Sequence, residues 1–142
     1  MEPLIALLVG FGLARLAGVA GVDVLDAWLP SLRVGLAVMF LFTGFAHFHH
    51  RLRAEIVDMV PPVLPRPDLL VTLTGVLQIV GAVGLLIPAT ALWAAVCLIL
   101  LLIVQYPANV SAAKRGTSQG DPIVMRTVYQ LVYIGALALT LI

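Results

Sequence analysis

The residues that could do chemistry are polar side chains set inside long apolar stretches. Arg126, Gln130 and Tyr133 are spaced i, i+4 and i+7, which places them on one face of a helix. Amide, imidazole, guanidinium and phenol groups in such positions would hydrogen-bond the few polar atoms of a lipophilic molecule. The candidate ligand-binding residues are His47, Gln78, Asn109, Arg126, Gln130 and Tyr133.

Catalytic and metal chemistry have less support. His47 and His50 share a helical face, but two imidazoles are not a full ligand set, and Glu55 and Asp58 follow a predicted bend. We therefore expect no metal. Among the residues inside apolar stretches only His47 titrates near neutral pH, and no carboxylate accompanies it there. Catalytic residues stay unassigned, and whether the chain is an enzyme is left open.

The composition indicates the solvent in which these residues lie. The chain has 142 residues, of which 62% are hydrophobic and 11% charged, and its mean hydropathy is +1.13. Soluble domains are about 45–50% apolar and about 25% charged, so we expect a single domain embedded in a lipid bilayer. A net charge of +1 argues against nucleic-acid binding. The one cysteine, Cys97, cannot form an intramolecular disulfide.

Segment lengths predict an all-α integral membrane protein, an antiparallel bundle. A helix needs about 20 mostly apolar residues to cross the hydrocarbon core. Five stretches qualify, at residues 3–21, 31–47, 68–87, 89–106 and 122–142. Ser31 and Asp68 are predicted to cap the second and third helices, Pro107 to end the fourth, and Asp121 to cap the fifth. The first stretch is interpreted as a retained span rather than a cleaved signal, because no Lys or Arg precedes it.

Two connections carry the charge that predicts orientation. Residues 51–60 place Leu52, Ile56 and Met59 on one face, as in an interfacial amphipathic helix, and residues 107–121 are predicted to be a loop. The positive-inside rule then puts the N-terminus in the cytoplasm and the C-terminus outside. The cations on the cytoplasmic side would be Arg51, Arg53, Arg66, Lys114, Arg115 and Arg126.

A second group of charges lies at the predicted outer side. Arg15 and Arg33 flank Asp23 and Asp26 in sequence. A lone charge in lipid is costly, whereas paired charges at the interface are not. We therefore expect these four side chains to form a structural cluster in which they neutralise one another.

Several short motifs together resemble the DoxX family of small bacterial membrane proteins. They are residues 45–48 (FAHF), 59–62 (MVPP) with 64–67 (LPRP), 73–75 (LTG), 84–88 (GLLIP) and 106–110 (YPANV), with Arg33 upstream. The resemblance implies a four-helix core plus one N-terminal transmembrane helix, in a bacterial plasma membrane and a redox setting. Related sequences often have Glu where this chain has Gln78, and an amide cannot act as a proton-carrying acid.

Three functions remain as hypotheses. The first is an accessory or binding subunit that holds a quinone-like or other lipophilic molecule in a membrane redox system, next to an oxidoreductase partner. The second is a membrane oxidoreductase or isomerase in its own right, and the third is a purely structural scaffold. A quinone is the candidate small molecule, the bilayer is the expected environment, and homo-oligomerisation stays open.

Overall fold

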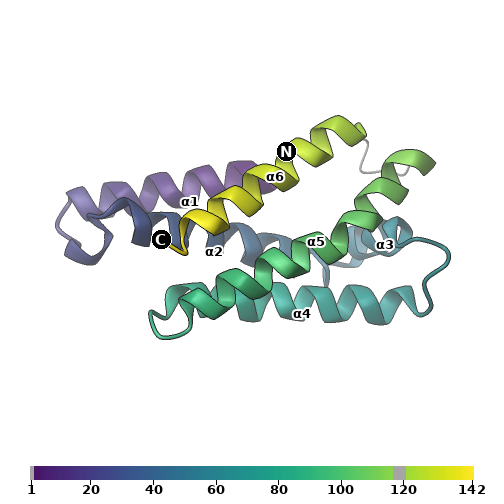
Figure 1. Ribbon diagram of the computed structural model, residues 1–142, viewed down its shortest axis with the longest axis horizontal. Helices are drawn as coiled ribbons and strands as arrows, with labels where there is room; N and C mark the ends of the chain where they lie inside the picture. The colour runs from purple at the N-terminus through teal and green to yellow at the C-terminus, as the bar shows by residue number, and fades with distance from the viewer. Residues whose placement is uncertain (1, 117–120) are drawn as a thin grey trace.

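The protein is described from a computed structural model, which describes residues 2–116 and 121–142. Its elements are α1 (Glu2–Val19), a short 3-10 turn η1 (Asp23–Leu25), α2 (Trp28–Ala46), α3 (His50–Met59), α4 (Pro67–Leu86), α5 (Ala91–Arg115) and α6 (Ile123–Leu139) (Figure 1). All regular structure in these two ranges is helical, so the all-α prediction is confirmed.

Four helices are long and apolar enough to cross a membrane, namely α1, α2, α4 and α5. The fifth predicted span corresponds to α6, which is apolar but has only 17 residues. At about 1.5 Å per residue it is about 26 Å long, slightly less than a hydrocarbon core of about 30 Å. The lengths and compositions therefore bear out four of the predicted apolar spans.

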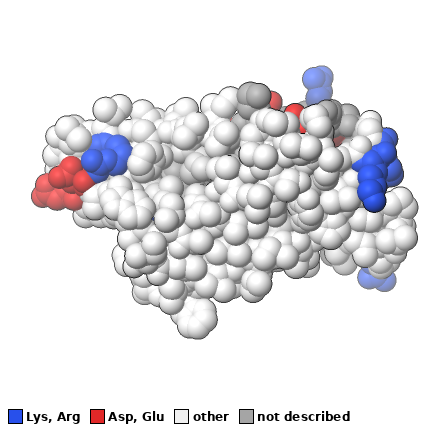
Figure 2. All heavy atoms as spheres, turned by 45° about the horizontal axis from the view of Figure 1, so that its top comes forward, with Lys and Arg blue, Asp and Glu red and all other residues white. Residues whose placement is uncertain are grey.

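The surface has the character expected from the composition. Large apolar side chains are exposed on every long helix, among them Leu16, Val80, Val104 and Leu131, each more than 60% exposed. Charged side chains gather at the two ends, with a broad band of uncharged atoms between them (Figure 2). No Asp, Glu, Lys or Arg occurs between Asp68 and Lys114. Such a band is what a protein solvated by lipid presents to its surroundings.

Glycines set the closest helix contacts. A Cβ added at Gly35 of α2 would lie 2.8 Å from the Leu7 carbonyl oxygen of α1. Between α2 and α4, a Cβ at Gly44 would lie 3.2 Å from the Gly75 carbonyl oxygen, and one at Gly75 would lie 2.7 Å from the His47 Cβ. Small residues let helix backbones approach closely where lipid supplies no hydrophobic drive. These contacts pack α1 on α2 and α2 on α4, which brings the polar residues of α2 and α4 together.

Two predicted N-caps have other roles. α2 begins three residues earlier than predicted, at Trp28, and the Ser31 hydroxyl donates to the Leu25 carbonyl at 2.9 Å. At α4, Pro67 is the first helical residue and follows Arg66, whose φ of 52° is left-handed. Proline has a fixed φ and no N–H, so it suits a first helical position and displaces Asp68 from the cap.

The largest difference from the expected boundaries is at Pro107. α5 continues through this proline to Arg115, whereas the sequence predicts a helix end at Tyr106 and a loop over residues 107–121. Residues 107–115 of that expected loop are helical, and residues 117–120 lie outside the described residues. Proline removes one backbone donor, and an internal proline is tolerated when neighbouring groups satisfy the carbonyl it leaves open. α6 begins at Ile123 after Pro122, with no side-chain cap.

The glycine contacts predict a clear stability difference. Gly35→Ala would force α1 and α2 apart, because the new Cβ meets backbone rather than a movable side chain, and we expect a lower Tm in detergent by several degrees. Gly12→Ala on α1 is the matched control, since its Cβ meets nothing within 4 Å. Equal Tm values for the two variants would contradict this packing.

Candidate functional site

Three side chains from three helices form one hydrogen-bonded line, which we call the amide line. The Thr43 hydroxyl of α2 donates to Gln78 Oε1 of α4 at 2.7 Å, and Gln78 Nε2 donates to Gln105 Oε1 of α5 at 3.3 Å. Gln78 is buried and Gln105 is half-buried. The line exists because the glycine contact at Gly44 and Gly75 brings α2 and α4 close enough for one amide to reach both neighbours.

His47, the residue that directly follows α2, is buried and lies four residues after Thr43 of the amide line. Its Nδ1 lies 2.7 Å from the Thr43 carbonyl oxygen. A carbonyl only accepts, so Nδ1 carries the proton and Nε2 of the neutral ring is the acceptor. Within the described ranges Nε2 has no hydrogen-bond partner. His47 is only 7% exposed, so Nε2 is a hydrogen-bond acceptor without a partner in the described ranges on a buried side chain.

Arg53 of α3 fixes the connection around His47. Its Nη1 donates to the His47 carbonyl at 3.0 Å, and its Nη2 donates to the Asp68 carbonyl at 2.9 Å and to Thr72 Oγ1 at 2.8 Å. The Asp68 carboxylate is 3.9 Å away. One guanidinium thus ties α3 to the end of α2 and the start of α4. The sequence carries no signal for this role, because every partner except His47 lies more than a dozen residues away.

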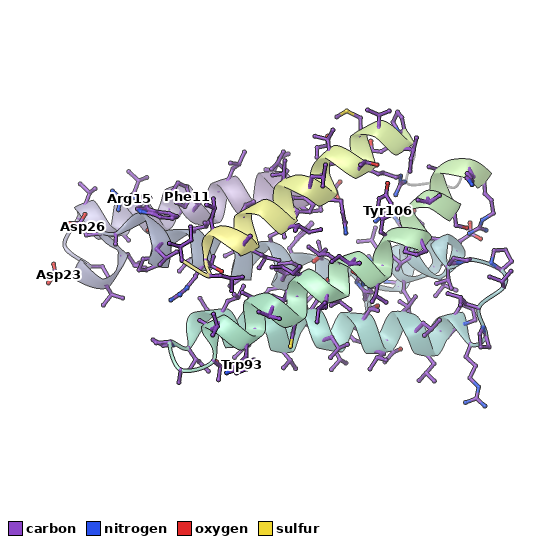
Figure 3. All side chains as sticks on the ribbon, viewed as in Figure 1. Phe11, Arg15, Asp23, Asp26, Trp93 and Tyr106 are labelled. Carbon is purple, nitrogen blue, oxygen red and sulfur yellow. The ribbon has the colours of Figure 1, made fainter. Side chains whose placement is uncertain are left out.

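A second polar group joins α5 to α6. Arg126 donates from Nη1 to Asn109 Oδ1 at 3.3 Å and from Nε to the Asp121 carbonyl at 2.9 Å. The Tyr106 hydroxyl lies 2.8 Å from Thr127 Oγ1, and Figure 3 shows Tyr106 at the bend of α5, on the side of α6. These contacts hold the segment after Pro107 against the beginning of α6.

Gln130 of α6 contacts α5 one turn before its proline. Pro107 has no N–H for the Ile103 carbonyl, and Gln130 Nε2 donates to the adjacent Leu102 carbonyl. In an α-helix the Leu102 carbonyl is the acceptor of the Tyr106 N–H, so the Gln130 bond joins α6 to α5 and does not replace the donor that Pro107 lacks. Gln130 is buried, and its Nε2 bonds to the backbone of another helix.

The candidate ligand-binding residues therefore separate into two groups. His47 and Gln78 lie with Thr43 and Gln105 on α2, α4 and α5, while Asn109, Arg126 and Gln130 join α5 to α6. Tyr133 is buried and stacks with Tyr129 at a centroid distance of 6.4 Å. Thr43, Gln105 and Arg53 were not in the predicted set, because each has its partner on another helix and isolated polar residues show no spacing pattern.

The predicted charge cluster is only partly assembled as expected. Arg15, Asp23 and Asp26 lie at the same end of the molecule (Figure 3), but the Arg15 guanidinium donates to the backbone carbonyls of Leu25 and Asp26. Arg33 Nη2 instead donates to the Thr140 carbonyl at 3.2 Å, at the end of α6, and its buried Nε has no partner among the residues that the structure describes. A cation beside a helix C-terminus is favourable because the last carbonyls carry partial negative charge.

Two open hollows lie at the other end, where α5 ends beside the connection from α3 to α4. One, of about 490 Å³, includes Tyr106, Pro107 and Lys114, and the other, of about 410 Å³, includes Asp58 and Pro67. Pro61 and Arg115 line both. None of the six predicted ligand-binding residues lines either hollow.

Gln78 is the residue on which the amide line depends. Gln78→Leu removes its bonds to Thr43 and Gln105, so we expect unfolding to become easier by about 1 kcal/mol, in keeping with about 0.6 kcal/mol per interhelical hydrogen bond. The measurement is Tm in detergent. Thr74→Val is the control, because the Thr74 hydroxyl donates only within α4, to the Val71 carbonyl. An unchanged Tm for Gln78→Leu would show that the line contributes nothing.

Comparison with known proteins corrects the expected family. A family model described as a domain of unknown function (DUF8561) matches residues 36–141. No curated protein and no solved structure matches the chain. The resemblance to DoxX is therefore wrong: it rested on motifs of three to five residues, and short runs of apolar residues, Gly and Pro recur in unrelated membrane helices. The chain belongs to the DUF8561 family.

Proposed function

We propose that this protein is an integral membrane protein with five antiparallel spans, α1, α2, α4, α5 and α6, in a bacterial plasma membrane. Support for the fifth span comes from the sequence around α6, which has no charged residue after Arg126. A helix slightly shorter than the hydrocarbon core is accommodated by local thinning of the bilayer at modest cost. The exposed apolar side chains of α6, including Leu131, favour a lipid-facing position.

The orientation follows from where the cations lie. α3, the start of α4, the end of α5 and the start of α6 share one end of the molecule (Figure 1), and six Lys and Arg residues are found in or next to these segments. Arg15 and Arg33 belong to the other end. The excess of cations favours the α3 end as the cytoplasmic side.

Cysteine labelling tests this orientation. In a Cys97→Ser background, Asp23→Cys should react with a membrane-impermeant maleimide in intact cells, whereas Arg51→Cys should react only after permeabilisation. Both positions are exposed at opposite ends of the molecule, so each reports one side. The reverse labelling pattern would overturn the orientation.

We further propose that the protein is a non-catalytic binding subunit for a lipophilic, carbonyl-bearing molecule such as a quinone. The observation that carries this is the open end of the amide line: Gln105 Nε2, on a half-buried side chain within an apolar helix, donates to no residue of the described ranges. An unused amide donor is unfavourable in an apolar environment, and a ligand carbonyl would satisfy it. His47 Nε2, directly after α2, is a second group without a hydrogen-bond partner in the described ranges, and it can accept a hydrogen bond from a ligand.

Ligand-dependent stability tests the binding proposal. We expect menaquinone or ubiquinone to raise the Tm of the purified protein in detergent. Gln105→Leu should remove this rise, while the unliganded Tm falls only by the loss of one interhelical hydrogen bond, from Gln78, of about 0.6 kcal/mol. Gln130→Leu is the matched control, since its amide is already engaged with Leu102; it should lower the Tm but keep the quinone effect. The binding proposal is contradicted if neither quinone raises the Tm and no quinone copurifies with the protein.

A structural scaffold is the second candidate, and one observation favours it. Gln78, Asn109, Arg126 and Gln130 all bond to a residue on another helix, so most of the candidate ligand-binding residues already join helices. A scaffold predicts that Gln130→Leu and Gln78→Leu change stability alone and that no quinone effect exists in the unmodified protein.

A further inference from the structure

The larger hollow beside α5 has the chemistry of a site for an amphiphile; we call it the α5 groove. Its walls are formed by Pro61, Tyr106, Pro107 and Val110, and its volume is about 490 Å³. Ser111, Lys114 and Arg115 complete the lining, one to two turns after Pro107 along α5. Along α5 itself, the apolar lining residues thus come first and the hydrogen-bond donors Ser111, Lys114 and Arg115 follow toward the end of the helix.

The two cations of the α5 groove differ in how they are held. Arg115 donates from Nε to Ser111 Oγ at 3.0 Å and from Nη2 to the Asp58 and Val60 carbonyls, so its guanidinium has a fixed position. Lys114 is exposed and hydrogen-bonds to no residue in the described ranges. No carboxylate is among the groove's lining residues. The lining is therefore positively charged without a local counter-charge of its own.

The position of the α5 groove matches the boundary between hydrocarbon and headgroups. Lys114 is the first charged residue after Asp68, so the charge-free stretch ends at the rim of the groove. Along an ideal helix Tyr106 and Lys114 would be about 12 Å apart, enough to separate the start of an acyl chain from a phosphate. The cytoplasmic leaflet, where the proposed orientation puts this end, is the one whose anionic lipids attract juxtamembrane cations.

We propose that the α5 groove is a binding site for an anionic phospholipid. The phosphate would lie against Lys114, Arg115 and the Ser111 hydroxyl, and an acyl chain would lie along Tyr106, Pro107 and Val110. Charge complementarity and the apolar walls select this occupant over a soluble anion, which would leave the walls uncovered. The proposal rests on the proposed membrane insertion, and it is independent of the quinone site on Gln105.

The test compares lipids that share acyl chains and differ in headgroup charge. For the purified protein in neutral detergent, titrated while Tm is followed, we expect phosphatidylglycerol to bind about fivefold more tightly than phosphatidylcholine, as expected for one cation beside an anionic headgroup. Lys114→Glu should abolish the preference without unfolding the chain, because Lys114 is exposed. Arg51→Glu, the same charge change at the same end but outside the groove, should keep it.

Each other outcome overturns the site. Equal affinity for the two lipids, or a preference that survives Lys114→Glu, removes the groove from the interaction. If Arg51→Glu also loses the preference for phosphatidylglycerol, the overall charge of this end attracts the lipid. If inorganic phosphate alone raises the Tm as much as phosphatidylglycerol does, the groove is a phosphate site and not a lipid site. Val110→Ser provides the second variant: it should weaken both lipids alike if the wall holds an acyl chain. Extraction of membranes with alkaline carbonate separately tests insertion, so failure there is distinguishable from failure of the groove.

Discussion

The need to satisfy polar groups in surroundings that offer no water governs this protein, and Gln78 meets it most directly. Its amide accepts from Thr43 and donates to Gln105, so a single buried side chain joins α2, α4 and α5. That arrangement requires backbones in near contact, which the glycines at positions 44 and 75 permit. Where lipid surrounds the helices, such packing and hydrogen bonding replace the hydrophobic effect as the source of helix association.

The same requirement limits what the protein can bind. A polar side chain that joins two helices has part of its hydrogen-bonding capacity occupied, as Gln130 Nε2 is by the Leu102 carbonyl and Asn109 Oδ1 is by Arg126. Capacity for a ligand remains only where such a network ends or where a hollow opens beside cations. Gln105 is the end of such a network, and the α5 groove is a hollow beside the cations Lys114 and Arg115. The two lie on neighbouring stretches of α5, on either side of its proline bend.

Local patterns predicted the helices well because length and hydrophobicity are properties of a segment on its own. They failed at Pro107, where α5 continues to Arg115, because the contacts that hold the segment after the proline come from α6, as from Arg126 to Asn109. They also missed Arg53 and Thr43, whose roles exist only once α2, α3 and α4 are packed. The polarity of a residue inside an apolar stretch was enough to name it as a candidate ligand-binding residue. It could not show whether that residue faces a ligand or another helix.

One further consequence follows from the charge-free stretch that begins after Asp68 and ends before Lys114. It contains most of α4, the turn at residues 87–90 and most of α5, and the Thr90 hydroxyl donates to the Gly84 and Ile87 carbonyls within that turn. During biogenesis this helical hairpin can therefore be translocated as one unit without carrying any charge across the bilayer. In the orientation that we propose, the connection between α1 and α2 carries Asp23 and Asp26 across instead. In that orientation, the α4–α5 hairpin and the α1–α2 connection face different energetic barriers to insertion.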